Sequence, residues 1–348
     1  MKILVIGNMG YVGPGTVSQI RERYPNAEIL GFDIGYFANH LTNTDFLPEV
    51  KLNKQIIGDV RHFPKEILEG VDAVAYLAAI SNDPMGARYE EITMEVNYRS
   101  AVRIAEYAKE AGVKKFVYAS SCSIYGAADD YPKKEDDSLN PLTAYAKSKV
   151  AAEKDLEKYA SKDFVVTCLR FATACGMSNR LRLDLVLNDF VAGGIISKEI
   201  NILSDGTPWR PLINVLDMGL AIEWGIGRDA SNGGEYLYVN TGTSSWNYQV
   251  KKLAEAVSEI VPGCKVTVKE DAPPDKRSYR VNFDLFKKLA PEHQPKRDLI
   301  ITIRDLYESI SAMQLSDANF RDSKFMRLKI LASLREKGLL DENLNWTW

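Results

Sequence analysis

The sequence predicts an α/β fold, a doubly wound parallel sheet with a smaller C-terminal lobe, and three observations support this prediction. The chain opens with a short apolar run, Lys2 to Ile6, that leads straight into a glycine-rich loop. Further short apolar runs follow, each separated from the next by enough residues for a helix, which is typical of parallel strands with helices on both faces. With 348 residues, 45% of them hydrophobic, the chain can bury a full core and a lobe beside it.

The first loop contains three glycines, Gly7, Gly10 and Gly13, at intervals of three residues. Between a strand and a helix, such glycines let the backbone turn tightly. They also let a pyrophosphate approach the helix N-terminus, whose dipole favours negative charge. The loop therefore predicts a dinucleotide-binding Rossmann domain. The alternative is that the glycines only allow the helix to pack closely on the strand.

A second apolar run, Glu28 to Phe32, ends in Asp33. A carboxylate at the end of this strand can accept hydrogen bonds from both ribose hydroxyls of an adenosine and would repel a 2′-phosphate. No Lys or Arg lies between Gly31 and Val50 to compensate. We therefore expect NAD rather than NADP as the cofactor.

Other apolar runs continue the alternation, and they predict strands at Gln55 to Ile57, Ala73 to Leu77, Phe116 to Ala119, Phe164 to Arg170 and Tyr236 to Asn240. A helix is expected from about Tyr89 to Ala111, with Asn97 on the face that packs against the sheet. A buried amide is costly unless it is hydrogen-bonded. Asn97 therefore either fastens neighbouring backbone or touches the cofactor, and the sequence alone leaves both open.

The candidate catalytic stretch begins at the end of the strand Phe116 to Ala119, where Ser120, Ser121 and Ser123 follow in a loop. A helix then opens with Tyr145 and Lys149, four residues apart. At this spacing the two side chains share a helix face, so that an ammonium group can favour the ionised form of the phenol. We expect Tyr145 to exchange a proton with substrate near neutral pH, since a phenol with a pKa of about 10 would be a poor base.

The composition excludes several classes of function. The net charge is −3 and Lys and Arg are scattered along the chain, so we expect no nucleic-acid partner and no membrane partner. Four cysteines show no metal-ligand spacing and predict free thiols in a reducing compartment, with no metal site: Cys122, Cys168, Cys175 and Cys264. The chain starts with a core strand and has no run long enough to span a bilayer, which predicts a cytoplasmic protein.

Two parts of the chain are expected to fold around different cores. Residues 1–176 form the dinucleotide-binding domain, to which the chain returns at about 215–240, and residues 177–348 form a substrate lobe. The lobe ends in a helical extension with apolar residues at helical spacing and a stop at Gly338, namely Phe325, Leu328, Leu331 and Leu334. We expect the extension to pack against the lobe or a partner subunit.

With the glycine loop, Asp33, the serine-bearing strand end and the Tyr145/Lys149 pair in this order, the chain resembles the extended short-chain dehydrogenase/reductases. Within them it is most similar to the NAD-dependent nucleotide-sugar epimerases and dehydratases typified by UDP-galactose 4-epimerase. The resemblance is dense over residues 1–176 and does not extend to the final forty. It implies NAD as cofactor, a nucleotide-diphosphate sugar as substrate, and a homodimer formed through the helices that carry Asn97 and Tyr145.

Position by position, the resemblance implies three sets of site residues. The catalytic residues are Tyr145, Lys149 and Ser121. The cofactor-binding residues are Gly7, Gly10, Tyr11, Val12, Gly13, Asp33, Asp59, Val60, Leu77, Ala78, Ala79, Asn97 and Lys149. The substrate-binding residues are Ser121, Ser123, Tyr145, Thr173, Arg210, Asp275 and Arg277, with Arg210 as the ligand of the nucleotide diphosphate.

The sequence departs from the family pattern at several positions. The 4,6-dehydratases carry acids two or three residues before a Tyr-Gly pair, and this chain has Cys122 and Ser123 there, which disfavours elimination of water. Thr173 stands where the family has an asparagine. A second diphosphate arginine is missing before Asp275, and Arg277 and Arg280 are the candidates to replace it.

The hypothesis is an NAD-dependent nucleotide-sugar epimerase that transiently oxidises C4 of the sugar. The first alternative is a nucleotide-sugar 4-dehydrogenase or 4-keto-sugar reductase with net hydride transfer, which would use the same three catalytic residues. The alternative from another class is a non-catalytic NAD-binding sensor. A sensor would need the glycine loop and Asp33 but would have no use for Tyr145, Lys149 and Ser121 together.

Overall fold

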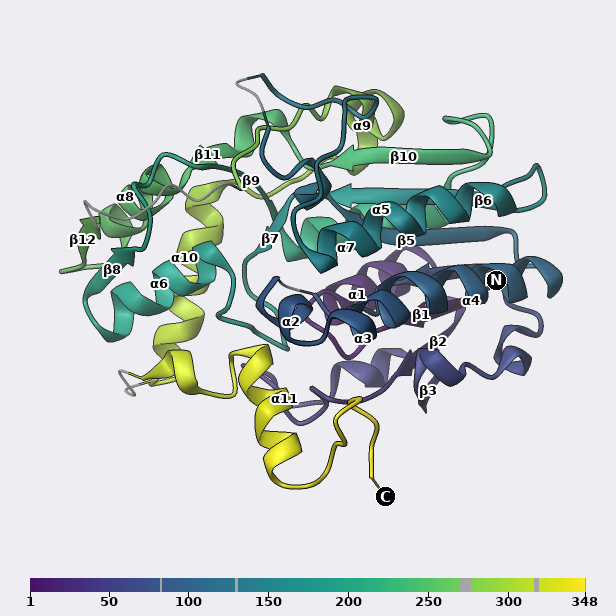
Figure 1. Ribbon diagram of the computed structural model, residues 1–348, viewed down its shortest axis with the longest axis horizontal. Coiled ribbons are helices and arrows are strands. Elements are labelled where there is room, and N and C mark those ends of the chain that lie inside the picture. The colour runs from purple at the N-terminus through teal and green to yellow at the C-terminus, as the bar shows by residue number, and fades with distance from the viewer. Residues whose placement is uncertain (82, 129–130, 269–276, 316–318, 348) are drawn as a thin grey trace.

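A seven-stranded parallel sheet forms the centre of the protein, as seen in a computed structural model that describes all residues except 82, 129–130, 269–276, 316–318 and 348 (Figure 1). Its strand order is β10-β6-β5-β4-β1-β2-β3. The strands are β1 Lys2–Ile6, β2 Glu28–Asp33, β3 Lys54–Ile57, β4 Ala73–Tyr76, β5 Lys115–Ser121, β6 Val165–Phe171 and β10 Tyr236–Thr241. The predicted fold class and each predicted strand are confirmed, including the return of the chain to the sheet at β10.

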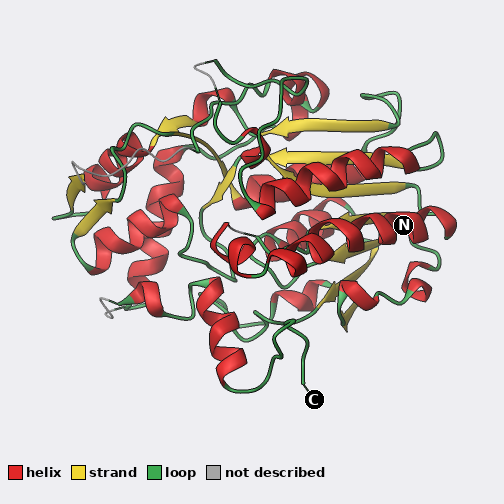
Figure 2. Cartoon of the chain, viewed as in Figure 1, coloured by secondary structure: helices red, strands yellow, loops and turns green. Residues whose placement is uncertain are grey.

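Helices cover both faces of this sheet, as Figure 2 shows. On one face α1 (Gly13–Arg23) and α7 (Val215–Gly227) pack on alternate residues of β1, Ile3 and Val5. On the other face α4 (Ser100–Glu110) and α5 (Ala144–Leu156) pack with Leu4 and Ile6. A strand that is apolar on both faces is therefore buried between two helix layers, which explains why its sequence is a continuous apolar run.

The helix expected from Tyr89 to Ala111 is present but has a π-helical turn in its middle. It runs as α3 (Glu90–Met94), a π-helical segment (Glu95–Arg99) and α4, and the short α2 (Asp83–Arg88) precedes it. Single π-helical turns inside α-helices are frequent at functional sites. Asn97 lies within this turn.

The lobe contains two small sheets and three longer helices. The strands are β7 Thr173–Cys175, β9 Trp209–Asn214 and β11 Asn247–Gln249 in one sheet, and β8 Glu199–Ile202 and β12 Lys265–Val268 in the other. The helices α6 (Val186–Ile196), α8 (Val250–Ile260) and α10 (Leu299–Ala312) enclose a second apolar core between them. The short helix α9 (Asp284–Leu289) contributes Phe286 to the core of the main sheet instead.

Short 3-10 turns complete the chain: Pro48–Lys51, Val60–His62, Lys65–Leu68, Cys122–Tyr125, Glu157–Tyr159, Ser244–Trp246, Pro291–His293 and Phe320–Asp322. Within the described residues, none of the helices combines the length and apolar character that crossing a membrane requires.

The C-terminal helix α11 (Arg327–Glu336) forms where the apolar spacing predicts it, and the chain turns after it at Gly338, whose φ is +67°. Leu331 of this helix packs with Leu340 and Leu344 of the following segment against Ile80 and Met85, which follow β4 of the main sheet (Figure 1). The expected packing on the lobe is therefore wrong for the apolar face of α11, whereas packing against a partner subunit stays a prediction. Helical spacing of apolar residues fixes a buried face, but it does not determine which surface covers that face.

Candidate active site

One cavity of about 920 Å³ lies where the loops that follow β1, β2, β3, β4 and β5 meet residues of the lobe. Next to it the strand order reverses between β1 and β4, which is where open α/β sheets bind their ligands. Most of the predicted site residues line this cavity: Gly7, Gly10, Tyr11, Val12, Asp33, Asp59, Val60, Leu77, Ala78, Ala79, Ser121, Ser123, Tyr145, Lys149, Thr173, Arg210 and Arg277. Gly13 and Asn97 do not line it, and Asp275 lies outside the described residues.

Two positions of the glycine loop require glycine, each for a different structural reason. Gly7 adopts a φ of +88°, and a Cβ there would lie 2.5 Å from the backbone nitrogen of Ala78. A Cβ on Gly13 would lie 1.9 Å from the carbonyl oxygen of Asn8, so this glycine allows the loop to close onto the start of α1. Both positions therefore require glycine for a tight turn or close packing, and the approach of a pyrophosphate to the loop stays a prediction.

Asp33 connects the glycine loop to the loop after β2. Its Oδ2 accepts a hydrogen bond from the Met9 amide at 2.9 Å, and its Oδ1 accepts one from the Gly35 amide at 2.8 Å. Burial raises the pKa of the carboxyl group, and these two amides oppose the rise. Each oxygen keeps a free lone pair, which leaves the carboxylate able to accept from two ribose hydroxyls.

Asn97 is fully buried, and its side chain is hydrogen-bonded to neighbouring backbone. This is the first of the two alternatives considered for it. Its Oδ1 accepts from the Ile80 amide at 2.8 Å, and its Nδ2 donates to the Ile80 carbonyl and to Ser148 Oγ, both at 3.1 Å. Asn97 therefore holds the loop after β4, which lines the cavity, and its side chain is not at the cavity surface.

Tyr145 and Ser121 meet at the floor of the cavity. The helix α5 begins at a capping residue, Thr143, whose Oγ1 accepts from the Ala146 amide at 3.2 Å, and this cap sets Tyr145 in the first turn. Ser121 ends β5, and its hydroxyl is close enough to the phenol of Tyr145 to act on the pKa of that group. The serine that would orient a substrate hydroxyl and the tyrosine that would take its proton are thus adjacent.

Lys149 lies one turn further along α5, buried beneath the tyrosine. Its Nζ donates to the carbonyl of Ala119 at 2.6 Å and lies 5.5 Å from the centre of the Tyr145 ring. Burial lowers the pKa of Lys149 to about 7, against the opposing effect of Glu153. The ammonium form that would act on Tyr145 is therefore itself disfavoured in this arrangement.

The prediction that Lys149 lowers the pKa of Tyr145 is not met in this arrangement. Burial raises the pKa of Tyr145 to about 12, while the neighbouring hydroxyl of Ser121 and the charge of Arg182 act to lower it. The net shift is upward because burial of the phenol is the largest influence on it.

The end of the cavity formed by the lobe carries the two described arginines that the resemblance assigns to substrate. Arg210 donates through Nη1 to the carbonyls of Trp209 (2.9 Å) and Arg277. Arg277 is ion-paired with Asp83 at 2.5 Å. Of the two replacement candidates, Arg277 lines the cavity, whereas Arg280 lies 5.1 Å from the centre of the Trp209 ring and does not.

Small polar groups complete this end. Ser123 lines the cavity and its hydroxyl has no hydrogen-bond partner among the described residues. Thr173 and Tyr279 also line the cavity. Cys122, at the other position where dehydratases carry an acid, is fully buried, and its thiol donates to the carbonyl of Arg170 at 3.0 Å.

The four cysteines are free, as expected. Among the described residues, no group of three or more His, Cys, Asp or Glu side chains is placed to hold a metal ion.

Four cavity arginines were not predicted as site residues, namely Arg61, Arg182, Arg321 and Arg327, and two of them, Arg182 and Arg327, lie near Tyr11 of the glycine loop. Arg182 is held by Asp184, with Nε–Oδ1 and Nη2–Oδ2 distances of 2.7 and 2.9 Å, and it donates to Ser81 Oγ at 2.8 Å. Arg327 reaches the cavity from α11. The charges in the apolar stretch after Gly176 are a signal for the first, but the sequence offers no comparable signal for the second.

Comparison with known proteins agrees with this site. The NAD dependent epimerase/dehydratase family matches residues 3–239. The UDP-glucose 4-epimerase of Corynebacterium glutamicum is 26% identical over 75% of this chain and 80% of its own. The human dTDP-D-glucose 4,6-dehydratase is 31% identical over 45% of this chain and 46% of its own.

Among solved structures, MoeE5 in complex with UDP-glucuronic acid and NAD superposes with a TM-score of 0.76, at 23% identity over 90% of this chain and all of its own. This likeness reaches across the lobe as well as the main sheet. The glycine loop, Asp33 and the Tyr145/Lys149 pair lie within or beside one cavity, and the family match covers all of them. The chain therefore belongs to the NAD-dependent epimerase/dehydratase family of extended short-chain dehydrogenase/reductases.

Proposed function

We propose that this protein is an NAD-dependent nucleotide-sugar epimerase that acts by transient oxidation at C4 of the sugar. The observation that carries the proposal is the convergence of Ser121, Tyr145 and Lys149 on a cavity that reaches the glycine loop at one end and Arg210 at the other. A binding protein that only senses NAD would gain nothing from a serine placed beside the first-turn tyrosine.

The chain's own residues supply the acid–base chemistry. Tyr145 removes the proton from the C4 hydroxyl as a hydride leaves C4, and Ser121 orients that hydroxyl through its own. Bound NAD, held by the glycine loop, Asp33 and Lys149, supplies the hydride acceptor. In an epimerase Tyr145 then returns the proton after the ketone has turned over and received the hydride on its other face.

The substrate is proposed to be a nucleotide-diphosphate sugar. Arg210 and Arg277 offer positive charge at the lobe end of the cavity, and Thr173 and Ser123 line the same cavity with hydroxyl side chains. In this proposal residues 1–176 and about 215–240 hold the cofactor, and residues from 177 onward provide the sugar and nucleotide contacts. We propose a homodimer through α4 and α5, which light scattering would test, and cytoplasmic localisation stays a prediction.

Elimination of water is disfavoured by the residues two and three positions before the Tyr125-Gly126 pair. Cys122 is turned into the core and Ser123 is not an acid, so neither can protonate a leaving hydroxyl as a carboxylic acid would. Asp83 is close enough to raise the pKa of Tyr145, but its carboxylate is paired with Arg277 at 2.5 Å. Net oxidation or reduction of the sugar remains the second candidate, because it would use the same three residues.

The test is a panel of nucleotide sugars incubated with NAD-loaded protein, with the products separated by chromatography. The proposal expects one sugar to be converted to its C4 epimer without accumulation of reduced cofactor. A 4-keto product formed together with stoichiometric reduced cofactor would support the dehydrogenase instead. An unsaturated or 6-deoxy product would show that the protein is a dehydratase.

A further inference from the structure

The last segment of the chain reaches the cofactor side of the cavity. Arg327, the first residue of α11, is 1% exposed, and it lines the cavity together with Met326 and Leu331. The family match ends at residue 239, so this contribution lies outside the part of the chain that the family describes.

Among the described residues no ion pair joins the buried guanidinium of Arg327 to a carboxylate, although the charge of Asp184 acts on it. It lies 4.2 Å from the centre of the Phe37 ring, and its Nη2 donates to the carbonyl of Arg180 at 2.7 Å. Its Nη1 is buried and has no hydrogen-bond partner among the described residues. A buried donor on a charged group is costly to leave unpaired, so its environment lacks one acceptor.

The charges around it are not balanced. Arg180 is paired with Glu49 at 3.2 Å and Arg182 with Asp184 at 2.7 Å, whereas the ion pairs of the described residues give Arg327 no carboxylate. Burial, together with Arg182 and Arg180, lowers the pKa of Arg327 to about 9. A buried guanidinium that has no ion pair is stabilised by an anion beside it, so Arg327 offers a place for an anionic ligand.

The position of Arg327 indicates which anion it meets. It is near enough to Tyr11 of the glycine loop for its charge to influence the pKa of that phenol, and Phe37 belongs to the loop that follows Asp33. The glycine loop and the start of α1 are where a dinucleotide diphosphate binds. The diphosphate of the sugar substrate, in contrast, is assigned to Arg210 and Arg277 at the other end of the cavity.

From these contacts we propose that Arg327 is a ligand of the NAD diphosphate, so that residues from the C-terminal segment complete the cofactor site. The inference rests on the family's cofactor and does not depend on which sugar reaction the protein performs.

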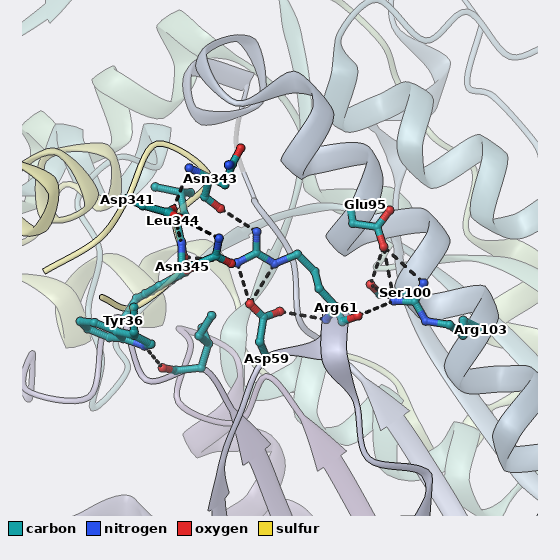
Figure 3. A network of polar contacts seen from close by, with 12 residues as sticks. Tyr36, Asp59, Arg61, Glu95, Ser100, Arg103, Asp341, Asn343, Leu344 and Asn345 are labelled. Atoms are coloured by element: carbon teal, nitrogen blue, oxygen red, sulfur yellow. Dashed lines mark hydrogen bonds and ion pairs between the residues drawn. The ribbon is translucent and has the colours of Figure 1, made fainter. Parts of the chain in front are cut away.

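Hydrogen bonds fasten the same segment to the two loops that carry Asp33 and Asp59 (Figure 3). Arg61 is paired with Asp59 at 2.6 Å, and its Nη1 donates to the carbonyl of Asn343 at 2.6 Å. The hydroxyl of Tyr36 donates to the Leu344 carbonyl, and Trp346 Nε1 donates to the Ile34 carbonyl at 2.8 Å. The segment that begins with Arg327 is therefore fastened to the loops beside the cavity, and Arg327 itself lies against Phe37 of one of these loops.

The test compares ligands that differ in the diphosphate. Protein stripped of cofactor is titrated with NAD, ADP and adenosine for the wild type, Arg327→Gln and the matched control Lys329→Gln, which removes an exposed charge from the same helix. Loss of charge-assisted hydrogen bonds predicts affinity for NAD and ADP roughly 10- to 100-fold weaker in Arg327→Gln, with adenosine unchanged. Lys329→Gln should match the wild type, and Arg327→Lys should recover part of the ADP affinity.

The folding of the stripped protein supplies a second readout. Removal of an uncompensated buried charge predicts that Arg327→Gln has a melting temperature no lower than that of the wild type without ligand, although it binds NAD less tightly. An equal loss of adenosine and ADP affinity, or undiminished ADP affinity, would overturn the inference. A wild type that binds no NAD would overturn it as well, whereas a failure to epimerise any sugar would refute only the proposed function.

Discussion

The two ends of the cofactor side of the cavity are built in different ways. At the catalytic end Ser121, Tyr145 and Lys149 come from one strand and the next helix, within the region that the family matches. At the other end, where the adenosine half of NAD is proposed to bind, residues next to β2 and β3 meet residues from the C-terminal segment, such as Arg327 and Trp346. The comparison teaches that the chemistry depends on a short local arrangement, whereas the proposed retention of the cofactor depends on contacts between distant parts of the chain.

The electrostatics of the two ends also differ. At the catalytic end burial moves both titratable groups toward their neutral forms, with a pKa of about 7 for Lys149 and about 12 for Tyr145. At the other end Arg180 and Arg182 each pair with a carboxylate, whereas Arg327 has no ion pair among the described residues. These differences fit the proposed roles, which are proton transfer at one end and the holding of an anion at the other.

The largest expected effect concerns the catalytic end. Tyr145→Phe removes the only group that the proposed mechanism uses to take and return the proton, so turnover should fall by a factor of about a thousand or more. NAD affinity should not change, because the proposed cofactor contacts remain. The control is Tyr131→Phe, which removes the hydroxyl of a half-exposed tyrosine outside the cavity and should leave turnover intact. Comparable turnover in the two variants would refute the mechanism.

A smaller effect concerns the stability of the protein as a function of pH. Lys149 has a folded-state pKa of about 7 and an ordinary value of 10.5. Between these values the unfolded chain binds the proton and the folded protein does not. The free energy of unfolding therefore increases as pH rises. Below pH 7 both states are charged, and folding bears the cost of burying the ammonium.

The free energy of unfolding of the wild type should therefore rise by an amount on the order of 2 kcal/mol between pH 7 and 9. Lys149→Met should lack this rise, and urea denaturation without ligand would measure both proteins. The buried thiols, whose pKa values are raised, are common to both proteins and cancel in the difference. Lys147→Met, at an exposed position of the same helix, should keep the wild-type slope. Equal slopes for wild type and Lys149→Met would contradict the assignment.

The smallest effect concerns the fastening of the C-terminal segment. Arg61→Gln removes the contacts with the Asn343 and Leu344 carbonyls, and NAD should dissociate several-fold to about tenfold faster as the segment opens more often. Arg99→Gln, which breaks an exposed ion pair with Glu91, should dissociate NAD at the wild-type rate. Stopped-flow displacement of bound NAD would measure both, and an unchanged rate in Arg61→Gln would show that the segment does not retain the cofactor.

Sequence reasoning succeeded where one short stretch determines the structure. The strand, loop and helix around Gly7 and Gly10 follow from the backbone conformation that their spacing requires, and Asp33 follows from its position at the end of β2. Ser121 and Tyr145 were found for the same reason, since each occupies a fixed place at the end of β5 or the start of α5.

It failed where the outcome depends on burial or on a distant partner. The pKa shifts of Tyr145 and Lys149 follow from how deeply α5 is covered, which the spacing of the pair does not reveal. Apolar spacing predicted α11 but not its partner, because Phe325 joins the core of the lobe while Leu331, six residues later, packs beside Ile80. Arg327 could not be identified as a site residue without that packing.

The most direct test of the central claim is the fate of the hydrogen at C4 of the sugar. A nucleotide sugar that the protein isomerises is prepared with deuterium at C4 and incubated with NAD-loaded protein, and the product is analysed by mass spectrometry and NMR while the absorbance of reduced nicotinamide is followed. The account predicts an epimerised sugar that retains deuterium at C4, with no accumulation of reduced cofactor. Loss of deuterium from the sugar, with a matching accumulation of deuterated reduced cofactor, would contradict it.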